Sequence, residues 1–163
     1  MFKLKILTAV LLFVLALSGC ADNQKIENNI QIQGRTTNNE NFNSLDFMGT
    51  PIIINFWYPS CPPCIKEIPT LVQTSERYEN KILILGIIHN SLFDSEEDRQ
   101  NMIDKFNVHY PNIFDEEGKI FQKFNIVGFP STIFLDKNHE IIEEWTGFLS
   151  EESLYKYAEE MMQ

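Results

Sequence analysis

Basic residues are scarce in this 163-residue chain, which has 13 lysines and arginines against 23 aspartates and glutamates and a formal net charge of −10. Such an acidic surface argues against nucleic acid or anionic lipid headgroups as direct partners. The chain also lacks internal repeats, and its low-complexity content is limited to one Asn-rich segment. Its hydrophobic content of 44%, with 13 phenylalanines, excludes wholesale disorder and suits one globular domain with short extensions.

The apolar run at the N-terminus is too short to span a bilayer comfortably. It covers residues 6–17, follows Lys3 and Lys5, and precedes small residues, which is typical of a secretory signal. The closing string Leu-Ser-Gly-Cys ends at Cys20 and resembles the bacterial lipobox, whose cysteine is lipid-modified and becomes the mature N-terminus. The alternative is an uncleaved membrane anchor with an incidental cysteine. Both interpretations place the remaining chain outside the cytoplasm, on a membrane.

These signals divide the chain into a signal peptide at 1–19, a lipidated Cys20 with a flexible tether at 20–29, and a folded domain at 30–163. The tether is polar and Asn-rich and shows neither helical nor strand periodicity. Isolated apolar residues from Ile30 to Phe47 then predict a short strand or hairpin at the edge of the domain.

Apolar periodicity in the domain predicts strands that alternate with amphipathic helices. A short extended stretch at 110–115 and a short helix after it complete the pattern. The order β-α-β-α-β-β-α predicts an α/β fold with parallel strands joined by crossovers and an antiparallel hairpin at the end. The predicted strands are 52–57, 82–88, 131–135 and 141–145, and the predicted helices begin at Cys61, after Ser95 and after Ser150.

Cys61 and Cys64 stand at the start of a predicted helix, directly after a buried strand. Unpaired N–H groups and the macrodipole at a helix N-terminus favour the Cys61 thiolate, which can attack a substrate disulfide, while Cys64 resolves the mixed disulfide. The alternative is a static structural disulfide, as in many secreted proteins. Pro62 and Pro63 lack N–H groups that could bond the Cys61 sulfur, which favours a more reducing pair.

These motifs together resemble the thioredoxin fold, and most closely its TlpA/ResA-like branch of membrane-anchored thiol–disulfide oxidoreductases. The resemblance covers residues 30–162 and implies a central mixed sheet flanked by helices, with an N-terminal edge strand or hairpin. It also implies that the Cys61–Cys64 disulfide is the redox group, without a further cofactor. The matching segments are Asn55-Phe56-Trp57, Cys61-Pro62-Pro63-Cys64, 66–71, Gly128-Phe129-Pro130-Ser131-Thr132 and the Gly147 turn.

The resemblance assigns substrate contacts around the cysteine pair. Pro130 matches the cis-proline that faces the pair, and Phe129 before it would offer backbone groups to an extended substrate peptide. Trp57 and Tyr58 are predicted to wall the site, although either could be a core or edge aromatic residue. Ser60 replaces the tryptophan that usually precedes the first cysteine, so Cys61 is expected to be more open.

The sequence does not assign the residue that accepts the proton of Cys64. Thioredoxin has a buried aspartate for this purpose where this chain has Asn55, and an asparagine side chain cannot act as that base. Glu67 and His89 are the candidates, and water is a further alternative.

A metal site is not predicted, because the three histidines are scattered and share no ligand spacing with the cysteines. A Sco-like copper-binding or delivery module is one alternative, since two thiolates suit Cu(I), but those relatives have three residues between the cysteines. A peroxiredoxin is not expected because Tyr58 stands where a peroxidatic site has threonine or serine.

We therefore predict an extracytoplasmic, lipid-anchored oxidoreductase that reduces disulfides in exported proteins. The resemblance implies apocytochrome c or another exported thiol enzyme as substrate. Since NADPH is not available outside the cell, a membrane thiol carrier would donate the electrons. A disulfide-forming oxidase is the alternative within the same chemistry, and its reduction potential would distinguish it. A monomer is the usual state for this fold.

Overall fold

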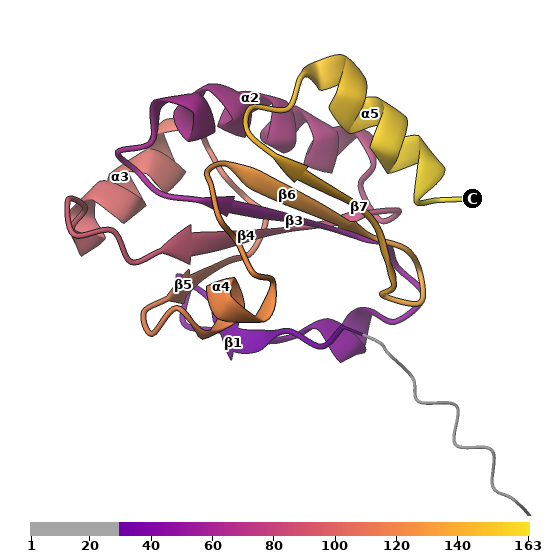
Figure 1. Cartoon of the computed structure of the whole chain (residues 1–163), viewed down its shortest axis with the longest axis horizontal. Coiled ribbons are helices and arrows are strands. Elements are labelled where there is room, and N and C mark those ends of the chain that lie inside the picture. The colour runs from indigo at the N-terminus through magenta and orange to yellow at the C-terminus, as the bar shows by residue number, and fades with distance from the viewer. Residues whose placement is uncertain (1–29) are drawn as a thin grey trace, which may run out of the picture.

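The computed structural model describes residues 30–163, so the predicted signal peptide, Cys20 and the tether lie outside the described residues. The described chain forms a small hairpin, a five-stranded sheet, and helices on both faces of that sheet (Figure 1). Among residues 30–163, none of the helices combines the length and the apolar character that crossing a membrane requires.

The elements follow the predicted alternation and define a mixed sheet. The strands are β1 (Gln33–Arg35), β2 (Asn41–Asn43), β3 (Ile52–Trp57), β4 (Leu83–His89), β5 (Asn112–Asp115), β6 (Ser131–Leu135) and β7 (Ile141–Thr146). The helices are the 3-10 turn η1 (Ser44–Phe47) and α2 (Pro62–Arg77), α3 (Glu96–Lys105), α4 (Lys119–Lys123) and α5 (Glu151–Glu160).

The pairing of the strands confirms the predicted fold class. β1 and β2 pair antiparallel and form the predicted N-terminal hairpin. The five-stranded sheet has the order β5-β4-β3-β6-β7, in which β3, β4 and β5 are parallel while β6 runs antiparallel to both β3 and β7.

β3 lies at the centre of the sheet, and all six of its residues are buried, as its continuous apolar run predicts. Ile53 and Trp57 point into the core between the sheet and α2, α3 and α5. Ile52, Ile54 and Phe56 point into the second core, which the hairpin and α4 cover on the opposite face (Figure 1). Each face of the sheet therefore has its own apolar core.

β5 adds a strand to the predicted order, and α4 confirms the short helix predicted after it. The sequence indicates only an extended stretch at 110–115, because Pro111 and polar residues interrupt its apolar pattern, yet this stretch pairs with β4 as an edge strand. The buried Asp115 carboxylate accepts the N–H groups of Ile120 and Phe121, each at 2.9 Å, and so anchors the first turn of α4.

The side chains of Trp57 and Asn112 form a hydrogen bond next to Gly86 of β4. The Trp57 Nε1–H donates to Asn112 Oδ1 at 3.1 Å. A Cβ at position 86 would come within 1.8 Å of that oxygen and 3.1 Å of the indole nitrogen. Asn112 also donates to the Tyr110 carbonyl at 3.0 Å, which restricts how far it can move. Only glycine fits at position 86, because the Asn112 side chain fills the space that a Cβ would need.

Gly86→Ala is expected to displace Asn112 and to lower the free energy of unfolding by about 1–3 kcal/mol, the usual cost of overpacking a core. Urea unfolding of residues 30–163 measures the change. If the clash with Asn112 is the cause, Gly86→Ala with Asn112→Ala will be no less stable than Asn112→Ala alone. Fully additive losses in the double variant would contradict this explanation.

Candidate active site

The strand directions bring four loops to one edge of the sheet. β3 and β4 are parallel and end side by side, and β6, antiparallel to β3, begins at that same edge, where β7 ends. We call this the disulfide edge and define it by the loops 58–61, 90–95, 125–130 and 147–150. The heads of the β3 and β4 arrows mark it on the left of Figure 1.

Cys61 and Cys64 form a disulfide at the start of α2. Cys61 is the N-cap residue, and Pro62 and Pro63 occupy the first helical positions, as the sequence predicts. The Cys64 N–H donates to the Cys61 sulfur at 3.3 Å. The sulfur therefore receives a backbone donor at the positive end of the helix macrodipole.

The disulfide is less open than the sequence suggested. Only 2% of the Cys61 surface is exposed, and Cys64 is also buried in the core beneath α2. The expected opening of Cys61 by Ser60 is not observed, because Cys61 packs into this core. The Ser60 hydroxyl instead donates to Asp94 Oδ2 at 2.9 Å.

The Phe129–Pro130 peptide bond is cis, as predicted. Because Ser131 pairs with Phe56, Pro130 lies beside the end of β3, where the chain turns towards Cys61. The Pro130 carbonyl accepts the Gly147 N–H at 2.8 Å. Within residues 30–163, the N–H and C=O of Phe129 have no hydrogen-bond partner, so they can pair with an incoming strand.

Trp57 and Tyr58, the two aromatic residues predicted to line the site, differ in their burial. Tyr58 is half-buried, and its ring packs edge-on against Phe129 with 4.9 Å between centroids. Trp57 is buried in the core and bonds Asn112, so its assignment as a substrate contact needs correction. Its position in β3 turns it towards the core beneath α2, where it supports the site from below.

Glu67 is buried one helical turn after Cys64, with 1% of its surface exposed. Oε1 accepts from Asn55 Nδ2 at 2.9 Å and from the Thr132 hydroxyl at 3.4 Å, and Oε2 accepts the Leu149 N–H at 2.8 Å. Burial removes water from the carboxylate and raises the pKa of Glu67 from 4.5 to about 7, although these hydrogen bonds oppose the change.

His89, the other predicted proton acceptor, lies at the end of β4 in an aromatic cluster. Its ring packs 4.8 Å from Phe121 and 5.1 Å from Phe129, and more loosely against Tyr58. Its Nδ1 is buried without a hydrogen-bond partner in the described part of the chain. His89 therefore adjoins Phe129, whereas Glu67 lies on the helix that carries the cysteines.

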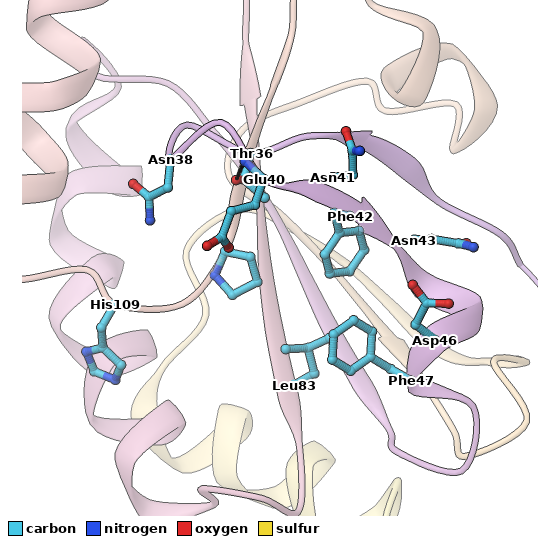
Figure 2. Close-up of a pocket in the computed structure, with 11 residues that line it drawn as sticks. Thr36, Asn38, Glu40, Asn41, Phe42, Asn43, Asp46, Phe47, Leu83 and His109 are labelled. Atoms are coloured by element: carbon cyan, nitrogen blue, oxygen red, sulfur yellow. Dashed lines mark hydrogen bonds between the residues drawn. The ribbon is translucent and has the colours of Figure 1, made fainter.

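A pocket of about 370 Å³ lies away from these residues, against the N-terminal hairpin (Figure 2). Phe42, Phe47 and Leu83 approach one another in it, among polar side chains that include Glu40. None of the predicted site residues lines this pocket. Within residues 30–163, no three His, Cys, Asp or Glu side chains gather closely enough to hold a metal ion.

Residues 25–144 match the AhpC/TSA family. The chain belongs to the AhpC/TSA family. Its mixed sheet, cis-proline and Cys-x-x-Cys disulfide give this member the thioredoxin-like arrangement that the sequence resemblance predicted.

Curated relatives in the same family are named for disulfide chemistry. Thiol-disulfide oxidoreductase ResA of Bacillus thuringiensis is 27% identical over 118 residues, 71% of this chain and 66% of ResA, slightly under two thirds of its length. Thioredoxin-like protein YneN of Bacillus subtilis is 24% identical over 120 residues, 74% of this chain and 70% of YneN.

A solved structure independently supports the fold. A thioredoxin family thiol:disulfide interchange protein from Chlorobium tepidum matches with a TM-score of 0.75 and 22% identity, over 83% of this chain and 95% of that one. At this identity the likeness establishes the thioredoxin-like fold.

The raised pKa of Glu67 predicts how stability varies with pH. The native state binds the proton of Glu67 more tightly than the unfolded state does, so between pH 4.5 and about 7 its contribution to stability falls as pH rises. The loss approaches about 3 kcal/mol above pH 7. When both are measured from pH 4 to 8, the unfolding free energy of the wild type should therefore fall relative to that of Glu67→Gln, by about 3 kcal/mol in all. Parallel curves would contradict the raised pKa.

Proposed function

We propose that the chain is a thiol–disulfide oxidoreductase that reduces disulfide bonds in exported proteins. The observation that carries the proposal is the position of the Cys61–Cys64 disulfide at a helix N-terminus, beside a cis-proline segment whose Phe129 backbone is free to bind a peptide. The names of the curated relatives, ResA among them, support the same chemistry.

The proposed reaction transfers two electrons from the cysteine pair to a substrate disulfide. In the reduced protein, the Cys61 thiolate attacks one substrate sulfur, and the other substrate sulfur leaves as a thiolate and takes up a proton. Cys64 then loses its proton and attacks the Cys61 sulfur. This step forms the Cys61–Cys64 disulfide and releases the second substrate thiol. A dithiol carrier in the membrane would supply two electrons to restore the pair.

The surroundings of Cys61 favour its role as the nucleophile. The Cys64 N–H and the positive end of the α2 macrodipole both stabilise negative charge on its sulfur. Pro62 and Pro63 supply no further N–H donors, so the stabilisation stays moderate and favours a reductase over an oxidase. A reduction potential near about −270 mV would support a reductase, and one near about −120 mV an oxidase.

Glu67 is the better candidate to accept the proton of Cys64. It follows Cys64 by three residues on α2, which places the two side chains on the same face of the helix. A carboxyl whose pKa is about 7 exists in both protonation states near neutral pH, which is the condition for efficient proton exchange. His89 packs instead against Phe129, on the substrate side of the site.

The two cysteines have separable roles. Cys61→Ser is expected to abolish reduction of insulin disulfides, because the attacking sulfur is lost. Cys64→Ser should accumulate mixed disulfides with the substrate, because nothing resolves them. Turbidity assays and non-reducing gels measure these outcomes, with Cys20→Ser as the control that keeps the pair intact. Full insulin reduction by either Cys61→Ser or Cys64→Ser would refute the assignment.

The role of Glu67 predicts a pH-dependent defect. In the wild type, release of a substrate thiol from the mixed disulfide should accelerate as pH rises through about 7, as Glu67 ionises. In Glu67→Gln this acceleration should shift towards the pKa of an ordinary thiol, about 8.5. Stopped-flow measurements from pH 6 to 9 test this, and His89→Gln serves as the comparison. Superimposable profiles for the wild type and Glu67→Gln would exclude the role.

The proposed location depends on the N-terminal signal and on Cys20. Export and lipid attachment there would tether the domain to the outer side of a membrane, where exported proteins such as apocytochrome c fold. We expect radiolabelled palmitate to be incorporated into the full-length chain and not into Cys20→Ala, which should leave the membrane fraction. Equal labelling of both chains would show that another residue or an uncleaved anchor holds the protein.

A further inference from the structure

The three most exposed large hydrophobic side chains of residues 30–163 all lie at the disulfide edge. Leu92 is 99% exposed, Phe93 is 87% exposed and Val127 is 84% exposed, whereas the seven others with substantial exposure lie between 36% and 43%. Leu92 and Phe93 are adjacent in the loop between β4 and α3. Apolar side chains that remain in water at one end of a protein indicate a surface that binds a partner.

A groove of about 280 Å³ separates this loop from the segment that leads to the nucleophile. The Ser60 hydroxyl donates to Asp94 Oδ2 at 2.9 Å, so the loop is bonded to the residue immediately before Cys61. A substrate polypeptide whose cysteine reaches Cys61 can therefore place the residues next to that cysteine in the groove. Its lining includes Pro59, Ser60, Phe93, Asp94, Asp98 and Met102.

The groove is acidic. Asp94 and Asp98 line it, and Glu96 and Glu97 are exposed between them. Asp98 accepts the N–H and the hydroxyl of Ser95 in a capping box, and these bonds lower the pKa of its carboxyl, so it stays charged at neutral pH. The net charge of −10 adds to the attraction for a basic partner.

Within residues 30–163 the nearby cation, Arg99, forms no salt bridge with these carboxylates, although its charge contributes to the lowered pKa of Asp98. The guanidinium of Arg99 lies 3.7 Å from the centre of the Phe114 ring, in a cation–π contact with its own protein. The acidic groove and the apolar loop are therefore both available to one partner segment.

Strand order places this surface opposite the cis-proline segment. β3 leads to Cys61, β4 flanks it on one side and ends at the Leu92–Phe93 loop, and β6 flanks it on the other side and begins after Phe129. A polypeptide that crosses Cys61 can thus bond the Phe129 backbone on one side and reach the groove on the other.

We propose that Leu92, Phe93 and the groove lined by Asp94 and Asp98 select substrate polypeptides that carry an apolar and a basic side chain next to the cysteine attacked by Cys61. This proposal rests on the proposed oxidoreductase function and names the substrate class of that site. The Phe129 backbone contacts any extended chain, whereas this surface discriminates among chains by their side chains.

Single-turnover oxidation of the pre-reduced domain by peptide disulfides tests the selection. One peptide carries Leu and Lys beside its disulfide, a matched peptide carries Ser and Glu there, and glutathione disulfide serves as the small reference. For the wild type we expect the Leu-Lys peptide to react at least ten-fold faster than the Ser-Glu peptide at low salt, and the ratio to fall as salt is added.

Variants of the loop should remove the two parts of the preference separately. Leu92→Ser with Phe93→Ser should lower the ratio between the two peptides at least five-fold, and Asp94→Asn should make that ratio less dependent on salt. These side chains are on the surface, so the variants should keep the fold. The matched control is Met162→Ser, an exposed apolar residue next to the C-terminus. Figure 1 shows the C-terminus on the side of the molecule opposite the disulfide edge.

The outcomes distinguish a failure of the substrate preference from a failure of the oxidoreductase function. Equal rates for both peptides in the wild type, or an unchanged preference in the Leu92→Ser, Phe93→Ser variant, would overturn the selection while the oxidoreductase function stands. A pre-reduced domain that reacts with no disulfide, glutathione disulfide included, would overturn the proposed function and this inference with it.

Discussion

The central strand β3 pairs on both sides, in parallel with β4 and antiparallel with β6, and its residues are buried on both faces. A shift of one residue in this register would turn Asn55 away from α2 and exchange the two apolar cores, so the register is strongly specified. It places the cis-proline segment on one side of the Cys61 loop and the Leu92–Phe93 loop on the other. Both the disulfide chemistry and the proposed substrate surface depend on this pairing.

The same strand also anchors the carboxyl group beneath the disulfide. Asn55 of β3, Thr132 of β6 and the Leu149 N–H before α5 converge on Glu67. All three donors are neutral, so they hold the carboxyl in place without a positive charge that would keep it ionised, and burial raises its pKa to about 7. The asparagine that replaces a buried acid at this strand position thus positions an acid supplied by the helix.

Much of the site could be predicted from local sequence. The apolar run of β3, the cysteine pair after it and the proline-rich helix start are contiguous, and the cis form of Pro130 followed from a motif. The sequence could not distinguish Glu67 from His89, because distant parts of the chain make their surroundings. Thr132 and Leu149 bond Glu67, and the rings of Phe121 and Phe129 pack against His89. Strand alternation could have shown that Trp57 faces the core, but its place beside the motif favoured a surface role.

Exposure was the least predictable property. Cys61 is almost covered although no tryptophan precedes it, because the core beneath α2 encloses its sulfur. Conversely, Leu92 and Phe93 look like ordinary apolar residues in the sequence, and only the fold shows that they stand in water beside the acidic groove. The burial of Cys61 and the exposure of Leu92 and Phe93 both depend on how the loops of the disulfide edge pack together. Hydrophobic periodicity does not predict the packing of loops.

The proposed oxidoreductase function requires reversible cycling of the Cys61–Cys64 pair between disulfide and dithiol. Equilibrium titration of the folded domain in thiol–disulfide buffers, followed by alkylation and mass spectrometry, measures this. We expect both thiols to appear together in one two-electron transition at about −270 mV. A pair that stays fully oxidised below about −300 mV would behave as a structural disulfide and would contradict the account.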